Sequence, residues 1–146
     1  MADESRQLAT LLLGNAMGFH LAAKRIASCG VERDFPWPPF FANTGYALEL
    51  SLKAYIIHSG GTDKKCRAIG HDLHRAIDAA CALDLTHPSQ AVMALVDRIG
   101  PYHRDHNFRY MAPIDVEVLP DVQETLTVTN QHLLSIADQL PELLPE

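Results

Sequence analysis

Residues 98–111, RIGPYHRDHNFRYM, place three arginines and two histidines within fourteen positions. The chain as a whole has the opposite balance, with a formal net charge of −6 over 146 residues. Arginine offers a planar set of N–H donors that suits phosphate, and histidine gains or loses a proton near neutral pH. We therefore predict a local anion-binding patch on an acidic body. Its side chains are expected to converge on one hollow: Arg98, His103, Arg104, His106 and Arg109.

A second group of polar residues lies earlier in the chain. Glu49 and Lys53 stand four positions apart, the spacing of an ion pair across one turn of a helix. Apolar stripes flank them, so the pair is either partly buried, where it holds a neighbouring backbone or a partner's charge, or a plain support of its helix. Asp72 is suited to cap the helix that follows it, and His71 beside it is a candidate for a polar rim near Lys53.

Two histidine pairs raise the question of a metal. His71 and His74 lie three residues apart, and His103 and His106 repeat that spacing with Asp105 between them. Zinc binds imidazole and carboxylate groups, but this pattern is too loose to define a zinc site. The glycines of SGG and LLLGNAMG lack the strand and the lysine of a phosphate-binding P-loop. We accordingly expect no metal and no cofactor.

The elements that must position these residues are predicted to be helices. Apolar residues recur at gaps of three and four along the chain, and no run alternates as a half-buried strand does. Helices are expected over about residues 8–28, 40–58, 73–81, 92–99 and 121–140. The helix at 40–58 has two apolar stripes and is expected at the centre. The fold class is therefore all-α, an up-and-down bundle of four to five helices in a single domain over residues 1–146.

Three segments are expected to interrupt the helices. VERDFPWPPFF holds three prolines in four residues, which predicts a rigid connector. Its aromatic residues are expected to fold back onto the bundle: Phe35, Trp37, Phe40 and Phe41. SGGTDKKCRAIG is expected as a glycine-rich polar loop, and Gly100-Pro101 is expected to end the helix that precedes His103.

Three segments together resemble the HEPN superfamily (higher eukaryotes and prokaryotes nucleotide-binding domains): ELSLKAYIIHSGG, then GHDLHRAI, then YHRDHNFRY after another helix. The resemblance covers roughly residues 40–110. It implies a bundle of four or five helices in up-and-down topology, usually paired as a symmetric dimer. Members bind nucleotides or RNA. Some are metal-independent ribonucleases of toxin-antitoxin and defence systems, and others are non-catalytic partners of small nucleotidyltransferases.

The ribonuclease branch of this superfamily carries an arginine followed, after four to six residues, by a histidine. Arg98 and His103 match that spacing, although Ile99 follows the arginine where catalytic relatives usually have a polar residue. In such a site the histidine takes the proton of an RNA 2′-hydroxyl and the arginine stabilises the phosphorane charge. The segment NFRYM is more similar to the Arg-Tyr segment of non-catalytic members, here Arg109 and Tyr110.

We predict a HEPN-like nucleotide- or RNA-binding module, acting in a toxin-antitoxin pair or beside a small nucleotidyltransferase, and expected as a homodimer. The residues expected to bind phosphate or nucleotide are Arg104, His106, Arg109, Tyr110, Lys53 and His71. One alternative is a metal-independent endoribonuclease with Arg98 and His103 as its catalytic pair. The other is a purely structural subunit that binds another protein.

The overall composition limits these possibilities. Hydrophobic residues make up 47% of the chain and charged residues 21%, as in ordinary globular domains. The acidic balance disfavours a general nucleic-acid coat protein, which needs many cations. The start, MADESRQ, is unlike a secretory signal, and the three cysteines are widely spaced, so we expect a cytoplasmic protein with reduced thiols and no membrane partner.

Overall fold

The prediction of an all-α bundle is confirmed by the computed structural model, which describes residues 2–29, 37–110 and 113–143 and contains no strand in these ranges. The helices are α1 (Ala2–Ser28), α2 (Trp37–His58), α3 (Asp63–Ile69), α4 (Leu73–Cys81), α5 (Gln90–Arg104) and α6 (Val122–Asp138), with short 3₁₀ turns η1 (Val116–Val118) and η2 (Pro141–Leu143). Phe35 of the predicted connector lies outside the described residues. None of the described helices has the length and apolar character needed to cross a membrane.

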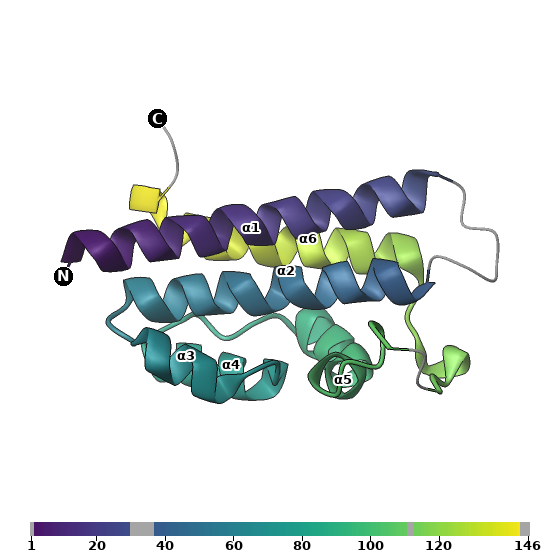
Figure 1. The fold of residues 1–146 in the computed structure, drawn as a ribbon. Helices are drawn as coiled ribbons and strands as arrows, with labels where there is room; N and C mark the ends of the chain where they lie inside the picture. The colour runs from purple at the N-terminus through teal and green to yellow at the C-terminus, as the bar shows by residue number, and fades with distance from the viewer. Residues whose placement is uncertain (1, 30–36, 111–112, 144–146) are drawn as a thin grey trace.

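Three long helices form one side of the molecule (Figure 1). α1 runs antiparallel to both α2 and α6, and α3, α4 and α5 lie against the other side of α2. α2 contacts every other α-helix, so its prediction as the central helix is confirmed. Its largest fully buried side chains have at most 1% of their surface exposed: Phe40, Phe41, Leu48, Leu52 and Ile56. The candidate site is built on the side of α2 that faces α3, α4 and α5.

The beginning of α2 differs from the prediction of a non-helical connector. The helix starts at Trp37, so Pro38 and Pro39 lie in its first turn. Proline is tolerated there because the first N–H groups of a helix have no partner within it. Phe40 and Phe41 are fully buried, which confirms that these two aromatic residues pack into the core.

Side-chain caps fix where the shorter helices begin. Asp72 accepts a hydrogen bond from the backbone N–H of Arg75 at 3.1 Å, which confirms it as the cap of α4. Ser89 caps α5 and Asp121 caps α6 in the same way. Each cap of this kind stabilises its helix by about 1 kcal/mol. His71 directly precedes this cap, in the short connection between α3 and α4.

The prediction that residues 59–70 form a loop is wrong for most of that segment, because it contains α3. Thr62 caps this helix by accepting from the backbone N–H of Lys65 at 3.1 Å. Gly70 ends it at a φ of 63°, a conformation that glycine adopts without strain. α3 buries only Cys66 and Ile69, so its apolar pattern is too short to identify it as a helix.

The prediction that Gly100-Pro101 ends the fourth helix is also wrong, because α5 continues through both residues to Arg104. Proline inside a helix removes a hydrogen bond and costs about 3 kcal/mol. Here the loss falls within the last turn, where burial of Ile99 and His103 holds the backbone in place. The continuation carries His103 to the side of α2.

Candidate functional site

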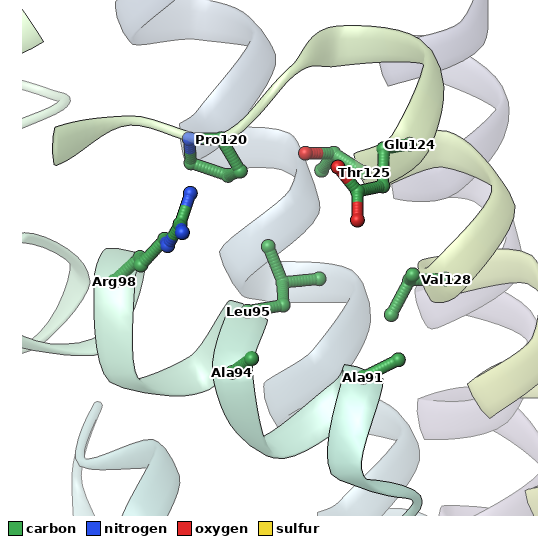
Figure 2. A pocket seen from close by; sticks show the side chains of 8 residues that line it. All are labelled: Ala91, Ala94, Leu95, Arg98, Pro120, Glu124, Thr125 and Val128. Carbon is green, nitrogen blue, oxygen red and sulfur yellow. The ribbon is translucent and has the colours of Figure 1, made fainter. Parts of the chain in front are cut away.

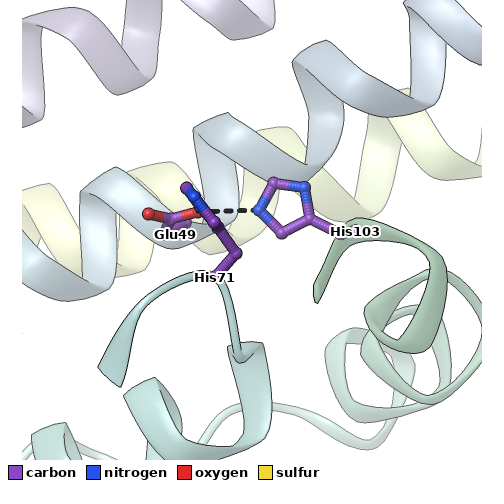
Figure 3. A group of neighbouring side chains, drawn as sticks. All are labelled: Glu49, His71 and His103. Carbon is purple, nitrogen blue, oxygen red and sulfur yellow. Dashed lines mark hydrogen bonds and ion pairs between the residues drawn. The ribbon is translucent and has the colours of Figure 1, made fainter. Parts of the chain in front are cut away.

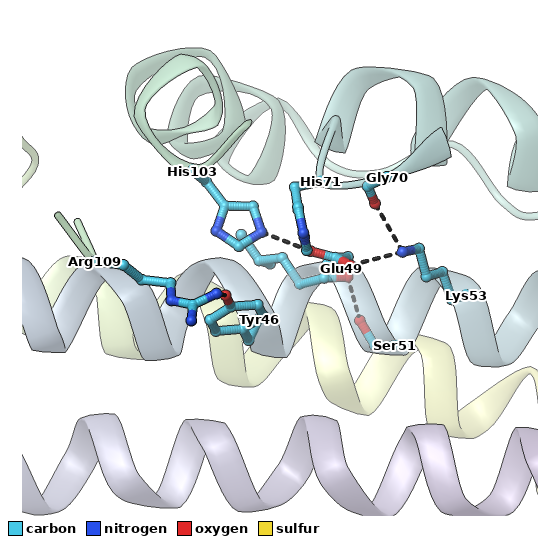
Figure 4. Close-up of polar contacts among 9 residues, drawn as sticks. Tyr46, Glu49, Ser51, Lys53, Gly70, His71, His103 and Arg109 are labelled. Carbon is cyan, nitrogen blue, oxygen red and sulfur yellow. Dashed lines mark hydrogen bonds and ion pairs between the residues drawn. The ribbon is translucent and has the colours of Figure 1, made fainter. Parts of the chain in front are cut away.

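A buried carboxylate lies at the centre of the candidate site. Glu49 is only 3% exposed, and its Oε1 accepts a 2.7 Å hydrogen bond from Nζ of Lys53. Its Oε2 lies 2.9 Å from Nδ1 of His71 and 2.7 Å from Nε2 of His103 (Figures 3 and 4). We call Glu49, Lys53, His71 and His103 the Glu49 cluster. Within it, one carboxylate is bound by three potential cations.

The cluster joins three separate parts of the fold. Glu49 and Lys53 lie one turn apart on α2, His71 lies between α3 and α4, and His103 lies in the last turn of α5. Lys53 also donates a 2.7 Å hydrogen bond to the carbonyl oxygen of Gly70. The expected ion pair is therefore partly buried and does hold a neighbouring backbone. The contacts tie α3, α4 and α5 to the central helix.

The charge of Glu49 decides which ring nitrogen of each imidazole carries a proton. Burial raises the pKa of Glu49, but hydrogen bonds from His103, Lys53 and His71 outweigh it and lower that pKa to about 2. An ionised carboxylate only accepts hydrogen bonds, so His71 donates from Nδ1 and His103 donates from Nε2. Because Nδ1 of His71 is occupied, its Nε2 is left to contact other groups, and the side chain is 35% exposed.

Gly45 makes room for His103, the more deeply buried of the two imidazoles. A Cβ atom at this position would overlap the ring of His103, with Nδ1 as its nearest neighbour. Tyr46 packs edge-on against His103, with ring centroids 5.0 Å apart. Sequence reasoning missed both residues as parts of the site. The only signal was their position in GYALELSLK, four and three residues before Glu49, which is one helical turn.

An outer face continues from the Glu49 cluster toward solvent, and we define it as His71, His106, Arg109, Tyr46 and Tyr110. His106 packs edge-on against His71, with ring centroids 4.5 Å apart. Nη1 of Arg109 donates to the hydroxyl oxygen of Tyr46 at 3.2 Å (Figure 4), and its guanidinium carbon lies 5.7 Å from the ring centroid of Tyr110.

The turn after α5 brings this face together. His106 has a φ of 59°, which is uncommon for a residue other than glycine. Its carbonyl oxygen accepts from the backbone N–H groups of Arg109 and Tyr110 at 3.0 and 3.1 Å. Desolvation, followed by the nearby charges of His71, Arg109 and His103, lowers the pKa of His106 below its usual 6.5. Its imidazole is therefore mostly neutral at pH 7 and gains a proton more readily when an anion arrives.

Two of the predicted cations lie apart from this group. Arg98 lines a pocket between α5 and α6, beside Pro120 and Glu124 (Figure 2). Arg104 is exposed, and its Nε donates to Oδ1 of the adjacent Asp105 at 3.0 Å. The expectation that all five cationic residues of 98–111 converge on one hollow therefore holds only for His103, His106 and Arg109.

The spacing that suggested a catalytic pair does not bring its two members together. His103 is 4% exposed, with its Nε2 bound to Glu49, whereas Arg98 points into the pocket beside α6. Lys53 and His71, predicted from the earlier segments, do lie in the cluster with His103. The structure thus groups most of the predicted phosphate-binding residues but separates Arg98 and Arg104 from them.

Glu49, His71 and His103 are also the donor types of a metal site, and one atom from each lies within 4.8 Å of the others. The 2.7 and 2.9 Å separations between nitrogen and Oε2 are hydrogen-bond lengths, whereas ligands of one tetrahedral zinc ion lie about 3.3 Å apart. Lys53 already neutralises the carboxylate at 2.7 Å. The arrangement is that of a hydrogen-bonded cluster.

A second buried imidazole lies on the opposite side of α2. Nε2 of His132, on α6, lies 3.0 Å from the hydroxyl oxygen of Ser51. His132 is 4% exposed, and burial lowers its pKa to about 4. It is therefore neutral at pH 7. This pair joins α2 to α6 inside the core.

No protein-family model matches this chain, and neither a curated protein nor a solved structure matches it.

Proposed function

We propose that this protein is a HEPN-like nucleotide- or RNA-binding module whose outer face contacts phosphate. The observation that carries the proposal is the position of His71. Glu49 fixes its Nδ1 at 2.9 Å, and its ring centroid lies 4.5 Å from that of His106, which lines a hollow together with Arg109. Groups that donate hydrogen bonds to an anion are thus gathered on an acidic chain and oriented before any ligand arrives.

The outer face offers both parts of a nucleotide-binding surface. Arg109 spends one N–H on Tyr46 and retains others for phosphate oxygens. His106 becomes a stronger donor when it takes up a proton. Tyr110 is 64% exposed and carries an aromatic ring on which a base can stack. Phosphate contacts and a stacking surface together favour a nucleotide or single-stranded RNA over free phosphate.

The resemblance to the HEPN superfamily supports the same class of ligand, because ELSLKAYIIHSGG, GHDLHRAI and YHRDHNFRY together supply the Glu49 cluster. It also leads us to propose a small nucleotidyltransferase as a protein partner. Co-purification of the two proteins tests that part separately from ligand binding.

Removal of the Arg109 guanidinium tests the proposal. In calorimetric titrations with AMP and with a short single-stranded RNA, we expect Arg109→Ala to bind about tenfold more weakly than the wild type, because one charge-assisted contact contributes about 1.5 kcal/mol or more. Arg67→Ala is the matched control, since Arg67 is exposed on α3 and pairs with Asp63 at 2.7 Å. Equal affinity in the wild type and both variants contradicts the proposal.

Endoribonuclease activity is the second candidate, and the pairing of Glu49 with His71 favours it. A carboxylate that holds one imidazole nitrogen orients the other as a general base. For this candidate we propose His71 as the general base in place of the predicted His103, because the His71 side chain is 35% exposed and that of His103 only 4%. This candidate predicts that the RNA used in the titrations is cleaved in the presence of EDTA, which gel electrophoresis of that RNA would show. RNA that stays intact contradicts it.

A further inference from the structure

The exposed side of α1 carries an apolar strip, which we define as Leu11, Gly14, Met17, Gly18 and Leu21. Leu11, Met17 and Leu21 are 64%, 38% and 45% exposed. They account for three of the six exposed large hydrophobic side chains in the described residues. The buried residues of α1 lie on the opposite side of the helix: Ala9, Leu13, Ala16, His20 and Ala23. The strip is therefore left over after the bundle has formed its own core.

The two glycines of the strip have no explanation within a single chain. A Cβ atom at Gly14 or Gly18 would meet nothing within 4 Å, and neither residue has a positive φ. Glycine inside a helix costs about 1 kcal/mol relative to alanine. On an exposed helix face, glycine allows another backbone to approach more closely than any side chain would. The strip is therefore shaped for a second helix.

The charges on α1 identify that helix. Asp3 and Glu4 lie at its beginning, and Lys24 and Arg25 lie near its end. Gly14 is the midpoint, eleven residues after Asp3 and eleven before Arg25, or about 16 Å each way at 1.5 Å per residue. In the described part of the chain none of these four side chains forms an ion pair.

A second copy of α1 fits these charges in one direction only. Antiparallel packing across Gly14 places the acidic beginning of each helix beside the basic end of the other, whereas parallel packing opposes like charges. These charges would also be favourable in a single helix, because they complement its dipole. The glycines therefore identify the interface, and the charges give its direction. The occupant that satisfies both features is another copy of the same chain.

A groove beside the strip agrees with this register. An open pocket is lined by Asp3, Arg6, Gln7, Thr10 and Leu11. In the antiparallel arrangement, Met17 and Leu21 of the second copy lie at the level of Leu11 and Gln7. Apolar side chains that are exposed in one copy thus fill the groove of the other, and the two-fold symmetry repeats the contact.

We propose that α1 forms a homodimer interface in which two copies pack antiparallel about a two-fold axis at Gly14. The Glu49 cluster lies on the side of α2 away from the purple ribbon of α1 (Figure 4), so both outer faces stay open and each copy keeps a complete site. This differs from a dimer whose two sites face one another across the axis. The proposal stands independently of the proposed function.

Sedimentation equilibrium over a range of concentrations tests the interface. We expect the wild type to be a dimer that dissociates on dilution, and Gly14→Leu to dissociate at least about tenfold more readily. The same substitution leaves the folded monomer at least as stable in urea, because the position is open and leucine is a better helix former. A wild type that is monomeric at every concentration, or a Gly14→Leu variant that dimerises like the wild type, overturns the proposal.

A charge exchange tests the direction of packing. One variant carries Asp3→Lys and Glu4→Lys, and the other carries Lys24→Glu and Arg25→Glu. Each alone is expected to dimerise at least about tenfold more weakly than the wild type, since like charges then meet at both ends. An equimolar mixture restores a heterodimer, because every opposed pair is complementary again. Failure of the mixture to associate more strongly than either variant alone overturns the antiparallel register.

Discussion

Glu49 shows how one residue can organise a site that is spread over several elements. Its two oxygens accept from Lys53, His71 and His103, at 2.7 to 2.9 Å. A buried carboxylate without these donors would lose its hydration and gain no hydrogen bonds in return. Loss of any one donor is therefore expected to weaken the whole cluster. The same contacts that stabilise the charge also fix the orientation of His71.

Neutralising this charge is expected to destabilise the protein strongly. In Glu49→Gln, Lys53 loses its counter-ion while its side chain stays only 11% exposed, and an amide cannot accept from all three donors. We expect the free energy of unfolding to fall by about 3 kcal/mol in urea titrations.

The control for this substitution is Arg67→Gln, which breaks an ion pair of the same i,i+4 spacing between side chains that are 80% and 50% exposed. Its expected cost is about 0.5 kcal/mol or less. Losses of equal size in the two variants would show that burial does not strengthen the Glu49 cluster.

Sequence reasoning found the residues of this cluster but not its connections. Glu49 and Lys53 share a helix, so their spacing predicts contact. His71 and His103 lie 22 and 54 positions from Glu49, and nothing in a spacing rule says that these residues share one carboxylate oxygen. The five-residue separation of Arg98 and His103 likewise predicted that the two side chains lie close together. In the structure, α5 directs them into different pockets.

At the scale of elements, the prediction succeeded where the apolar pattern is long. α1, α2 and α6 span 27, 22 and 17 residues, and each was expected. α3 has seven residues and was missed, because a pattern of two buried side chains cannot outweigh the glycines and charges around it.

The end of α5 was missed for a different reason. Gly100-Pro101 is a strong local signal for a helix end, but tertiary packing overrides it. Gly45 was missed for the same reason. Its role is to leave room for His103, and this is visible only when the last turn of α5 is known to reach α2. Close contact between helices from distant parts of the chain, which decides both cases, leaves no mark in local spacing.

At the scale of the whole molecule, buried ionisable groups make stability depend on pH, with the largest effects from His132 and Glu49. The pKa of His132 is lowered to about 4 in the folded chain and lies near 6.5 when unfolded, so between these values the unfolded chain binds the extra proton. Folding stability therefore falls as pH decreases from 6.5 to 4, by about 3 kcal/mol for this group. Protonation of Glu49, whose pKa is about 2, extends the loss from pH 4.5 downward.

Urea titrations at pH 7.5, 6.0 and 5.0 check this dependence. His132→Gln removes the titrating group but keeps a polar side chain beside Ser51, so its stability is expected to change less between pH 7.5 and 5.0. Part of the slope remains, because burial also lowers the pKa of His20. The same slope in the wild type and His132→Gln would contradict the assignment to His132.

The net charge of the chain and the donors of the outer face act on anions in opposite directions. A net charge of −6 repels phosphate at long range, so any binding depends on the local donors of the outer face. The proposed α1 interface leaves that face free in both copies. Ligand binding and dimerisation are therefore expected to be independent of each other.

The most direct test of phosphate binding at the outer face is NMR of the histidine side chains during a titration with AMP. We predict that the ring nitrogen resonances of His71 and His106 shift in a saturable way, while those of the core residue His132 do not move. The resonance of His74, which is exposed but bound to Asp97 at 2.7 Å, serves as the control for a surface imidazole. Rings of His71 and His106 that stay unchanged, or that shift no more than the ring of His74, would contradict the central claim.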